Sequence, residues 1–334
     1  MMSRVRVIAE AGVNHNGSPD RALAMVDAAA DAGADAIKFQ SFVPEALVSP
    51  AAQKADYQKT QTGDGSQLEM LRALQLDAPS HERLLAACAD RGIAFLSSPF
   101  DIPSVRLLAS LGAREFKIAS GEITNLPMLR EIAACAESVL LSTGMATLDE
   151  IAAAIEALEA AGLERSRITV LHCTTEYPTP FDEVNLLAMA EIRDRFGIEI
   201  GYSDHTRGIE VSVAAAALGA TVVEKHFTLD RSLPGPDHAA SVEPDELASL
   251  VTAVRNVSVA LGDGHKVPTP TESRNMPLVR KSIVAAAGIA KGETFTEANL
   301  TTKRPGTGLS PMLWDSVIGQ QAPRAFAPDE MIEL

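Results

Sequence analysis

Eight short apolar runs, rich in β-branched residues, alternate with longer Ala- and Leu-rich segments over most of the chain. The runs cover residues 5–11, 36–40, 94–98, 115–120, 139–143, 169–174, 199–203 and 221–227. Such runs are typical of buried parallel strands, and intervening segments such as residues 19–32 and 148–161 carry apolar residues at helical spacing. No glycine-rich dinucleotide fingerprint follows the first run, so eight strand–helix units favour a closed barrel over a doubly wound sheet. The predicted fold class is therefore α/β, a TIM (β/α)8 barrel.

The pattern changes after residue 261. The segment at 262–270 is rich in glycine and proline and indicates a linker, and brief strands and turns follow it. We expect a catalytic barrel at residues 1–262, a linker at 263–276 and a small β-rich domain at 277–334. Within the barrel, the longest segment without a regular pattern is 42–67. Placed after the second strand, it is expected to lie over the catalytic face as a lid or substrate loop.

Composition excludes several classes of function. The formal net charge of −15 argues against a general affinity for nucleic acid or for an anionic membrane surface. The three cysteines are odd in number and lack metal-ligand spacing, which favours a reducing compartment. No signal-peptide core precedes the first strand and no apolar stretch has the length of a membrane span. We therefore expect a cytoplasmic protein that acts on small molecules and holds anionic ones with locally placed Lys, Arg and backbone N–H groups.

Two histidines close neighbouring strand runs. His205 follows the seventh run and His226 lies at the end of the eighth. The carboxyl ends of parallel strands meet at one end of a barrel, where active sites of this fold lie. Two imidazoles delivered to that rim form half of a divalent-metal site.

Other polar residues are predicted at the same rim. Strand alternation puts Lys38 and Gln40 on one face of the second strand. The ends of later strands contribute Lys117, Ser120, Ser142 and Ser203, and Glu10 places a carboxylate in an apolar context on the first strand. Two ammonium groups with several hydroxyls form a suitable site for a phosphate and a carboxylate.

Each of these residues also has a structural interpretation. A single Lys at a strand end is usually a solvated rim residue, and a single His is usually a hydrogen-bonded structural residue. The functional interpretation is favoured because nearly every predicted strand ends in a group suited to one anionic, metal-assisted site. His81 and His265, by contrast, are expected at the surface.

Ten short segments now identify a resemblance that spans almost the whole chain. They are residues 8–18 (IAEAGVNHNGS), 37–40 (IKFQ), 116–122 (FKIASGE), 142–145 (STGM), 171–174 (LHCT), 177–178 (YP), 201–205 (GYSDH), 224–226 (EKH), 234–238 (PGPDH) and 303–306 (KRPG). With these segments the chain resembles the sialic acid synthase family, which includes N-acetylneuraminate and N,N′-diacetyllegionaminate synthases. The resemblance implies that the C-terminal part is the family's antifreeze-like (SAF) domain.

The resemblance implies an enzyme that condenses phosphoenolpyruvate with an open-chain, N-acetylated mannosamine-type sugar and water, releasing phosphate. It implies a divalent metal, Mn²⁺ or Mg²⁺, bound by His205 and His226. Phosphoenolpyruvate would be held by Lys38, Lys117, Ser120, Ser142 and Ser203. The sugar and the reaction centre would be lined by Glu10, Gln40, Glu122, Thr175, Tyr177 and Asp237, with Glu10, Glu122 and Asp237 as the catalytic carboxylates. Arg304 would reach the site of a neighbouring subunit, which implies a domain-swapped homodimer.

The identity of the sugar depends on one departure from the pattern. Thr175 stands where N-acetylneuraminate enzymes often have Asn, and the surrounding segment is closer to the N,N′-diacetyllegionaminate branch. That sugar precursor lacks the 6-hydroxyl and bears a second acetamido group. The alternatives are an N-acetylneuraminate or pseudaminate synthase, or a non-catalytic barrel that binds carbohydrate or a partner. The last alternative predicts a broken set of rim residues.

Overall fold

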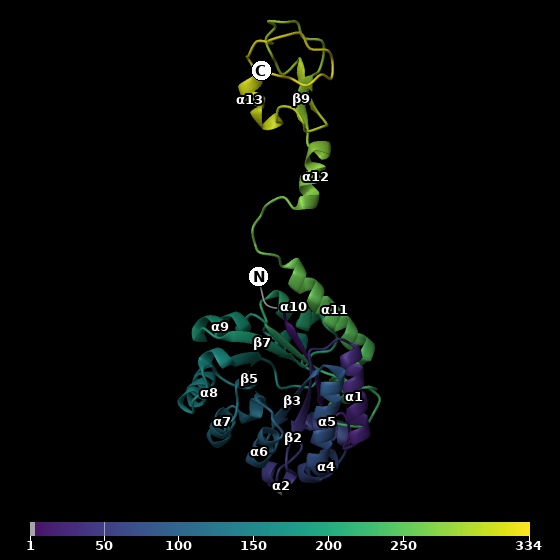
Figure 1. Cartoon of the computed structure of the whole chain (residues 1–334), viewed down its shortest axis with the longest axis vertical. Coiled ribbons are helices and arrows are strands. Elements are labelled where there is room, and N and C mark those ends of the chain that lie inside the picture. Colours follow the sequence, from purple (N-terminus) through teal and green to yellow (C-terminus); the bar gives the residue numbers. More distant parts are fainter. Residues whose placement is uncertain (1–3, 50) are drawn as a thin grey trace. The chain divides into compact units, whose positions relative to one another are not determined.

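The structure is a computed structural model that describes residues 4–49 and 51–334. The chain divides into two compact units at the junction of Asp263 and Gly264. Figure 1 shows a strand-and-helix barrel in the first unit and a small, mostly irregular fold in the second.

The first unit contains eight parallel strands. They are β1 (Arg6–Gly12), β2 (Ala36–Ser41), β3 (Ala94–Pro99), β4 (Glu115–Ile118), β5 (Ser138–Ser142), β6 (Ile168–His172), β7 (Glu199–Asp204) and β8 (Val222–His226). Their hydrogen-bonded order is β3-β2-β1-β8-β7-β6-β5-β4. The two end strands, β3 and β4, also contact each other, so the sheet forms a nearly closed barrel. The predicted TIM barrel is confirmed.

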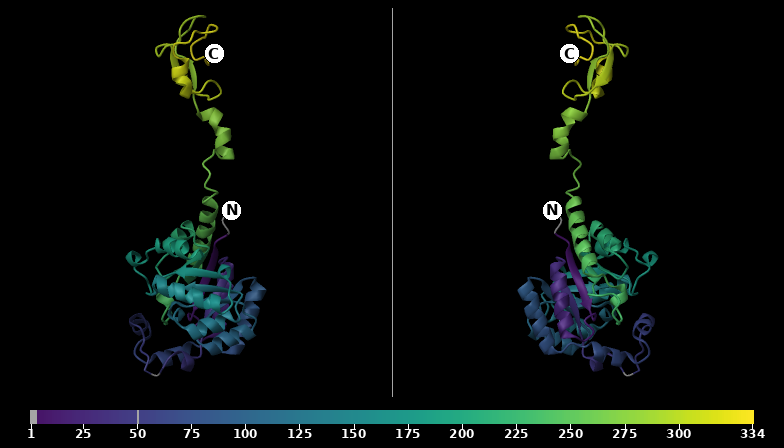
Figure 2. Two further views of the ribbon diagram at one scale, coloured as in Figure 1. Left: turned by 90° about the vertical axis from the view of Figure 1, so that its left-hand side faces the viewer. Right: turned by 90° about the vertical axis from the view of Figure 1, so that its right-hand side faces the viewer.

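Helices surround this barrel, as the views in Figures 1 and 2 show. They are α1 (Pro19–Asp31), α5 (Ala78–Arg91), α6 (Ile102–Ser110), α7 (Leu126–Ala133), α8 (Leu148–Ala160), α9 (Ala188–Phe196), α10 (Glu210–Ala217) and α11 (Pro244–Ala260). Short 3-10 turns occur at Ser120–Glu122, Arg165–Arg167, Phe181–Glu183 and His238–Ala240. The sequence explains where helices begin. Helix α8, for example, begins at a capping box in which Thr147 and Glu150 satisfy each other's backbone N–H groups.

Strand alternation divides the barrel side chains into two sets. Outward-facing residues such as Val7 and Phe39 pack against the helices in the main core. Inward-facing residues form a small apolar layer consisting of Ile8, Ala36, Leu96, Leu140, Leu171 and Val222. Two residues further along several of these strands, toward their carboxyl ends, the inward side chains are polar, as Glu10, Lys38 and Glu224 are. The apolar layer therefore forms the floor beneath a polar layer at the catalytic end.

The segment after β2 is more regular than the sequence predicted. It contains three short helices, α2 (Pro44–Leu47), α3 (Asp56–Thr62) and α4 (Gln67–Leu74). Figure 1 shows α2 and α4 together at one end of the barrel. A small core of Val13, Phe42, Leu71 and Leu74 is separate from the main one, and Leu47 of α2 packs against it. The expectation of an irregular segment at 42–67 was therefore wrong for α2 and α3, which lie within it. Helix α4 begins at its end, where a capping box at Ser66 and Glu69 satisfies backbone N–H groups.

The second unit contains helix α12 (Pro270–Val279), an antiparallel pair of strands, β9 (Ser282–Ala285) and β10 (Leu300–Lys303), a 3-10 turn at Pro311–Leu313, and the short helix α13 (Trp314–Val317). Its core includes Ile283, Phe295, Leu300 and Phe326. Helix α12 occupies part of the segment expected as a linker. In the part of the chain that the structure describes, no helix has the length and apolarity needed to cross a membrane.

Candidate active site

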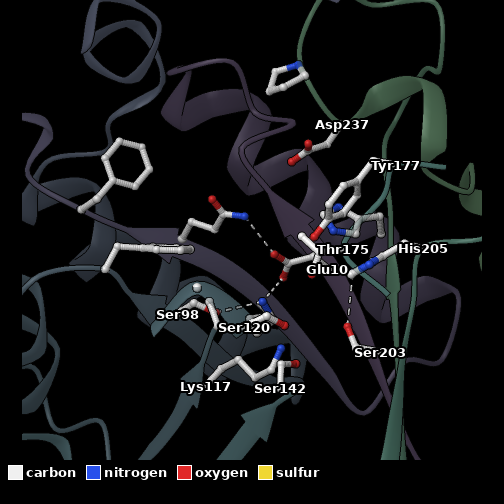
Figure 3. Close-up of a pocket in the computed structure, with 18 of the residues that line it drawn as sticks. Glu10, Ser98, Lys117, Ser120, Ser142, Thr175, Tyr177, Ser203, His205 and Asp237 are labelled. Atoms are coloured by element: carbon white, nitrogen blue, oxygen red, sulfur yellow. Dashed lines mark hydrogen bonds and ion pairs between the residues drawn. The ribbon is translucent and has the colours of Figure 1, made fainter. Parts of the chain in front are cut away.

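A cavity of about 320 Å³ opens among the carboxyl ends of the barrel strands. Its lining contains all but two of the residues that the sequence assigned to the site; Glu122 and Arg304 are the exceptions. Figure 3 shows Glu10 near the middle of the group, with Tyr177 and Asp237 on one side and Ser98, Ser120, Lys117 and Ser142 on the other. The rim residues that sequence reasoning placed together therefore do converge.

Four buried charged side chains form one network at the floor of this cavity. Nζ of Lys38 lies 2.7 Å from a carboxylate oxygen of Glu10 and 3.7 Å from one of Glu224. Nζ of Lys117 lies 2.9 Å from the same Glu224 oxygen, which also accepts a hydrogen bond from Ser203. These charged side chains are at most 4% exposed. Burial on this scale demands that each charge be paired, and the network meets that demand.

The network drives its two carboxylates to different pKa values. Burial raises the pKa of Glu10 to about 7, against the attraction of Lys38 and with a further rise from the neighbouring Glu224. Burial also acts to raise the pKa of Glu224, but Lys117 and Lys38 overcome it and lower this pKa to about 2. Burial acts to lower the Lys38 pKa, yet the pull of Glu10 and Glu224 raises it. Glu224 is thus a fixed anion, while Glu10 titrates near neutral pH and suits a role in proton transfer.

Hydroxyl groups gather beside the lysines. Lys38 donates to Ser98 at 3.0 Å, and the backbone N–H of Gly144 donates to Ser120 at 3.0 Å. The hydroxyls of Ser142 and Thr175 are buried without a hydrogen-bond partner in the described part of the chain. A Cβ atom on Gly144 would lie 2.2 Å from Oγ1 of Thr175, so only glycine permits this close approach. Unsatisfied buried hydroxyls next to two ammonium groups indicate a site for an anion with several oxygens.

The two histidines lie together at the mouth of the barrel. The ring centroids of His205 and His226 are 5.4 Å apart, and the Tyr177 ring lies 4.2 Å from that of His205. Burial lowers the pKa of His205 to about 4 and that of His226 well below its usual value, so both rings are neutral. Nδ1 of His205 faces the carbonyl oxygen of Thr174 at 2.6 Å and must donate to it, so Nε2 is the unprotonated nitrogen, and it lies 3.4 Å from the Ser203 hydroxyl.

These features fit a divalent metal in part. Nδ1 of His226 is buried without a hydrogen-bond partner, and His205 presents an unprotonated nitrogen. Two neutral imidazoles are suitable ligands for such an ion. Within residues 4–49 and 51–334, however, no three His, Cys, Asp or Glu side chains form a metal-binding group. The pair therefore fits an ion whose remaining ligands are water and substrate.

Three polar side chains converge around Gly12. A Cβ atom there would lie 3.3 to 3.5 Å from Oε1 of Glu10, Oδ2 of Asp237 and Nε2 of Gln40. Gly12 has a φ of 51° at a bulge in the β1–β2 ladder, a conformation that favours glycine. Burial raises the pKa of Asp237 to about 6. The bulge therefore brings a second carboxyl group of raised pKa next to Glu10.

Glu122 does not line this cavity. Glu122 is half-buried on a 3-10 turn and accepts a hydrogen bond from Asn125 at 2.7 Å. Arg304 belongs to the second unit, where its Nε donates to the carbonyl of Val279. The expectation of a surface position for His81 was wrong: it is 1% exposed and hydrogen-bonds Ser41 at 2.7 Å.

Sequence reasoning also missed two functional features. The sequence assigned no role to Glu224, although this residue lies two positions before His226 and therefore faces inward with it. Between them, Lys225 faces outward and pairs with Asp204 at 3.0 Å, both side chains being fully buried. This second pair stabilises the turn after β7 that carries His205, since Lys225 also donates to the carbonyl of Thr206.

The chain matches two families along its length. Residues 25–266 match the NeuB family, and residues 280–333 match the SAF domain. A protein of Campylobacter jejuni described as N,N′-diacetyllegionaminic acid synthase is 52% identical over 99% of both chains. A Legionella pneumophila protein of the same description is 43% identical over 94% of this chain and 89% of its own.

The chain is also similar to a solved structure. The N-acetylneuraminic acid (sialic acid) synthetase from Leptospira borgpetersenii, crystallised with citrate, superposes with a TM-score of 0.71 and 34% sequence identity. The match covers 82% of this chain and 90% of that one. Both the barrel and the site-bearing segments described above lie within the regions matched by these relatives.

Proposed function

The chain belongs to the NeuB family, and from this membership we propose that it is an N,N′-diacetyllegionaminic acid synthase. It is an enzyme of the phosphoenolpyruvate-using, carbon–carbon bond-forming class. The proposed reaction joins phosphoenolpyruvate to open-chain 2,4-diacetamido-2,4,6-trideoxymannose, adds water and releases phosphate. The observation that carries the proposal is the intact buried cluster of Lys38, Lys117 and serine hydroxyls around Glu10 and Glu224. A non-catalytic barrel would have no reason to keep it.

The lysine cluster is suited to phosphoenolpyruvate. Near neutral pH Glu224 is ionised and Glu10, with a pKa of about 7, is only partly ionised, so the two lysines give the network a net positive charge. An incoming phosphate and carboxylate find ammonium groups from Lys38 and Lys117 and hydroxyls from Ser120, Ser142 and Ser203. Local charge of this kind offsets the repulsion expected from a protein of net charge −15.

Glu10 is proposed as the group that acts on the reacting carbon atoms. Attack of carbon 3 of phosphoenolpyruvate on the sugar aldehyde leaves a cationic centre at carbon 2, to which water adds before phosphate departs. An ionised Glu10 stabilises that cation and orients the water, because a carboxylate in a dry site acts strongly on nearby charge. Its pKa of about 7 allows it to accept the proton that the water loses. Asp237 lies next to it and is proposed to bind sugar hydroxyls. For Glu122, which lies outside the cavity, the catalytic role stays a proposal without structural support.

His205 and His226 are proposed to hold a divalent ion, Mn²⁺ or Mg²⁺. When bound, the ion acts as a Lewis acid on the sugar aldehyde. The protein's own contribution is to keep both imidazoles neutral by burial and to fix the His205 ring through its bond to the Thr174 carbonyl. Tyr177 packs against both rings and limits their rotation.

The second unit is proposed to act on another subunit. Arg304 would hydrogen-bond the acyl oxygen of a sugar bound in a neighbouring barrel, giving a domain-swapped homodimer with two composite sites. Two-fold symmetry closes such an exchange without leaving unpaired surfaces.

The free thiols of Cys88, Cys135 and Cys173 support the expected cytoplasmic location.

The proposed function is tested by measuring phosphate release from phosphoenolpyruvate with Mn²⁺ or Mg²⁺ and a panel of sugars. The panel contains 2,4-diacetamido-2,4,6-trideoxymannose, N-acetylmannosamine and the diacetamido-trideoxy sugar that leads to pseudaminate. We expect the first to give the highest kcat/KM. A higher value for N-acetylmannosamine or for the pseudaminate precursor would assign the chain to one of those alternatives, and no release with any sugar would refute synthase activity.

A further inference from the structure

The lining of the active-site cavity has two chemically distinct parts. The charged residues that line it lie at strand ends or in the loop after β8. A different set comes from the segments that follow β2 and β3, namely Phe42, Leu47, Val48, Gln58, Gln67, Leu71 and Phe100. None of these seven residues is charged, and five of them are apolar. We call these seven residues the neutral wall.

The neutral wall is preformed. The rings of Phe42 and Phe100 meet edge to face with centroids 6.5 Å apart. The backbone N–H of Phe100 donates to the carbonyl of Ser41, and that of Val43 donates to Asp101 at 2.6 Å, which fixes both aromatic residues to the ends of β2 and β3. Leu71 is 8% exposed and packs in the same local core. Because these contacts hold the wall in place, its apolar surface is present before a sugar binds, and sugars are selected by their fit to that surface.

Two cations of the same segment are engaged elsewhere. Arg72 pairs with Glu45 at 2.7 Å on the exposed side, and Lys54 donates to the carbonyl of Gly63 at 3.0 Å. Neither lines the cavity. Among the described residues that do line it, the lysines are Lys38 and Lys117, and both belong to the network with Glu10 and Glu224. The neutral wall therefore offers no charge to a second anion.

The orientation of the sugar follows from the reaction centre. In the proposed reaction its aldehyde carbon reacts between Glu10 and the histidine pair at the ends of β7 and β8. The strand order puts the ends of β2 and β3 across the barrel mouth from β7, and the carbon-6 end of the sugar extends toward them. Phe42 and Phe100 directly follow the last residues of β2 and β3 and line the cavity. Thr175 is placed otherwise: it borders Gly144 and Ser120 in the hydroxyl cluster. The neutral wall is therefore placed to contact the far end of the sugar.

We propose that the neutral wall determines sugar specificity: it packs against the deoxygenated carbon-6 methyl and an acetyl methyl group, and it excludes sugars that carry a phosphate at carbon 6. This inference rests on the proposed function and names the element that selects the substrate. A methyl group gains from apolar contact. A phosphate against the same surface loses hydration without gaining a cation, which is costly.

The experiment measures kcat/KM at saturating phosphoenolpyruvate for three sugars: 2,4-diacetamido-2,4,6-trideoxymannose, N-acetylmannosamine and N-acetylmannosamine 6-phosphate. The wild-type enzyme should use them in that order. Val48→Thr keeps the side-chain shape and adds a hydroxyl to the wall. It should lower kcat/KM for the trideoxy sugar by ~10-fold while changing that for N-acetylmannosamine much less, with the KM for phosphoenolpyruvate unchanged. Ala46→Ser adds a hydroxyl at an exposed position of α2 outside the cavity lining, so it is the matched control and should leave all three values unchanged.

A second variant tests the exclusion of charge. Gln67 lines the wall at the start of α4. Gln67→Lys should raise the preference for N-acetylmannosamine 6-phosphate over N-acetylmannosamine by ~10-fold, a size typical of one ion contact in a partly dry pocket. Gln67→Met should not raise it.

The outcomes separate the two proposals. If no sugar supports phosphate release, the proposed function fails and this inference fails with it. If phosphate is released but the wild-type enzyme uses the 6-phosphate as well as the free sugar, or if Val48→Thr lowers kcat/KM equally for all sugars, the synthase assignment stands and the neutral wall is refuted as the specificity element.

Discussion

Replacing Glu224 with Gln removes one negative charge from the buried network and keeps the side-chain shape. Glu224 faces two ammonium groups, Nζ of Lys117 at 2.9 Å and Nζ of Lys38 at 3.7 Å, and its side chain is 4% exposed. After substitution, Lys117 has no carboxylate partner in the network. Removing one member of a buried ion pair costs about 3–5 kcal/mol, because the remaining charge stays buried without compensation.

The pKa of Glu224 gives a second route to this magnitude. A fall from 4.5 to about 2 corresponds to about 3 kcal/mol of stabilisation of the folded state. Because the folded pKa lies below the unfolded one, this stabilisation is fully present above pH 4.5 and is lost as the pH falls toward 2. At pH 7.5 the Glu224→Gln variant should therefore be less stable by about 3–5 kcal/mol, and the difference should shrink in acid.

The assay is denaturant unfolding followed by far-UV circular dichroism, since the single tryptophan, Trp314, lies in the second unit and does not report on the barrel. Glu131→Gln is a matched control. Glu131 pairs with Arg106 at 2.7 Å, but the side chains of Arg106 and Glu131 are 69% and 31% exposed, respectively. Its loss should cost at most ~1 kcal/mol. Adding Lys117→Met to Glu224→Gln should recover stability relative to the sum of the single changes. A cost no larger than the control, or a coupling below ~0.5 kcal/mol, would refute the argument.

Three further predictions concern activity. His226→Ala should lower metal-dependent turnover by ~10²-fold or more while leaving the circular dichroism spectrum unchanged, and full wild-type activity in the presence of chelator would contradict a metal role. In the wild-type enzyme kcat/KM should rise with an apparent pKa near 7 as the Glu10 carboxyl loses its proton, and Glu10→Gln should abolish this ionisation. An unchanged pH profile would assign the ionisation to another group. Mixing inactive His226→Ala and Arg304→Ala proteins and allowing subunit exchange should restore part of the activity, whereas no recovery after proven exchange would show that the second unit serves its own barrel or none.

Much of the barrel site was predictable because strand alternation decides which side chains point inward. Once the strands were placed, Lys38, Lys117 and Ser142 followed from the period of two. The pairing of Glu224 with Lys117 was not predictable in this way, since the two residues are 107 positions apart and meet only when the barrel closes. The same limit applies to Asp204 and Lys225. Strand alternation points both side chains away from the barrel interior, but their contact depends on the turn after β7.

Two errors have local causes. His81 was expected at the surface, although Leu84 and Cys88 follow it at helical spacing and mark the buried face of α5. Helices α2 and α3 within segment 42–67, and α4 at its end, were missed because elements of four to eight residues show little periodicity. The capping box at Ser66 and Glu69 was the readable signal for the last of them.

The central claim is that this chain joins phosphoenolpyruvate to a six-carbon sugar with cleavage of the carbon–oxygen bond. The most direct test incubates the enzyme with the trideoxy sugar, a divalent metal and phosphoenolpyruvate labelled with ¹³C in its three carbons and with ¹⁸O in the bridging oxygen, followed by mass spectrometry. The account predicts a nine-carbon acid that contains all three ¹³C atoms, and phosphate that retains the ¹⁸O. An unlabelled sugar product, or ¹⁸O retained in the acid and absent from the phosphate, would contradict it.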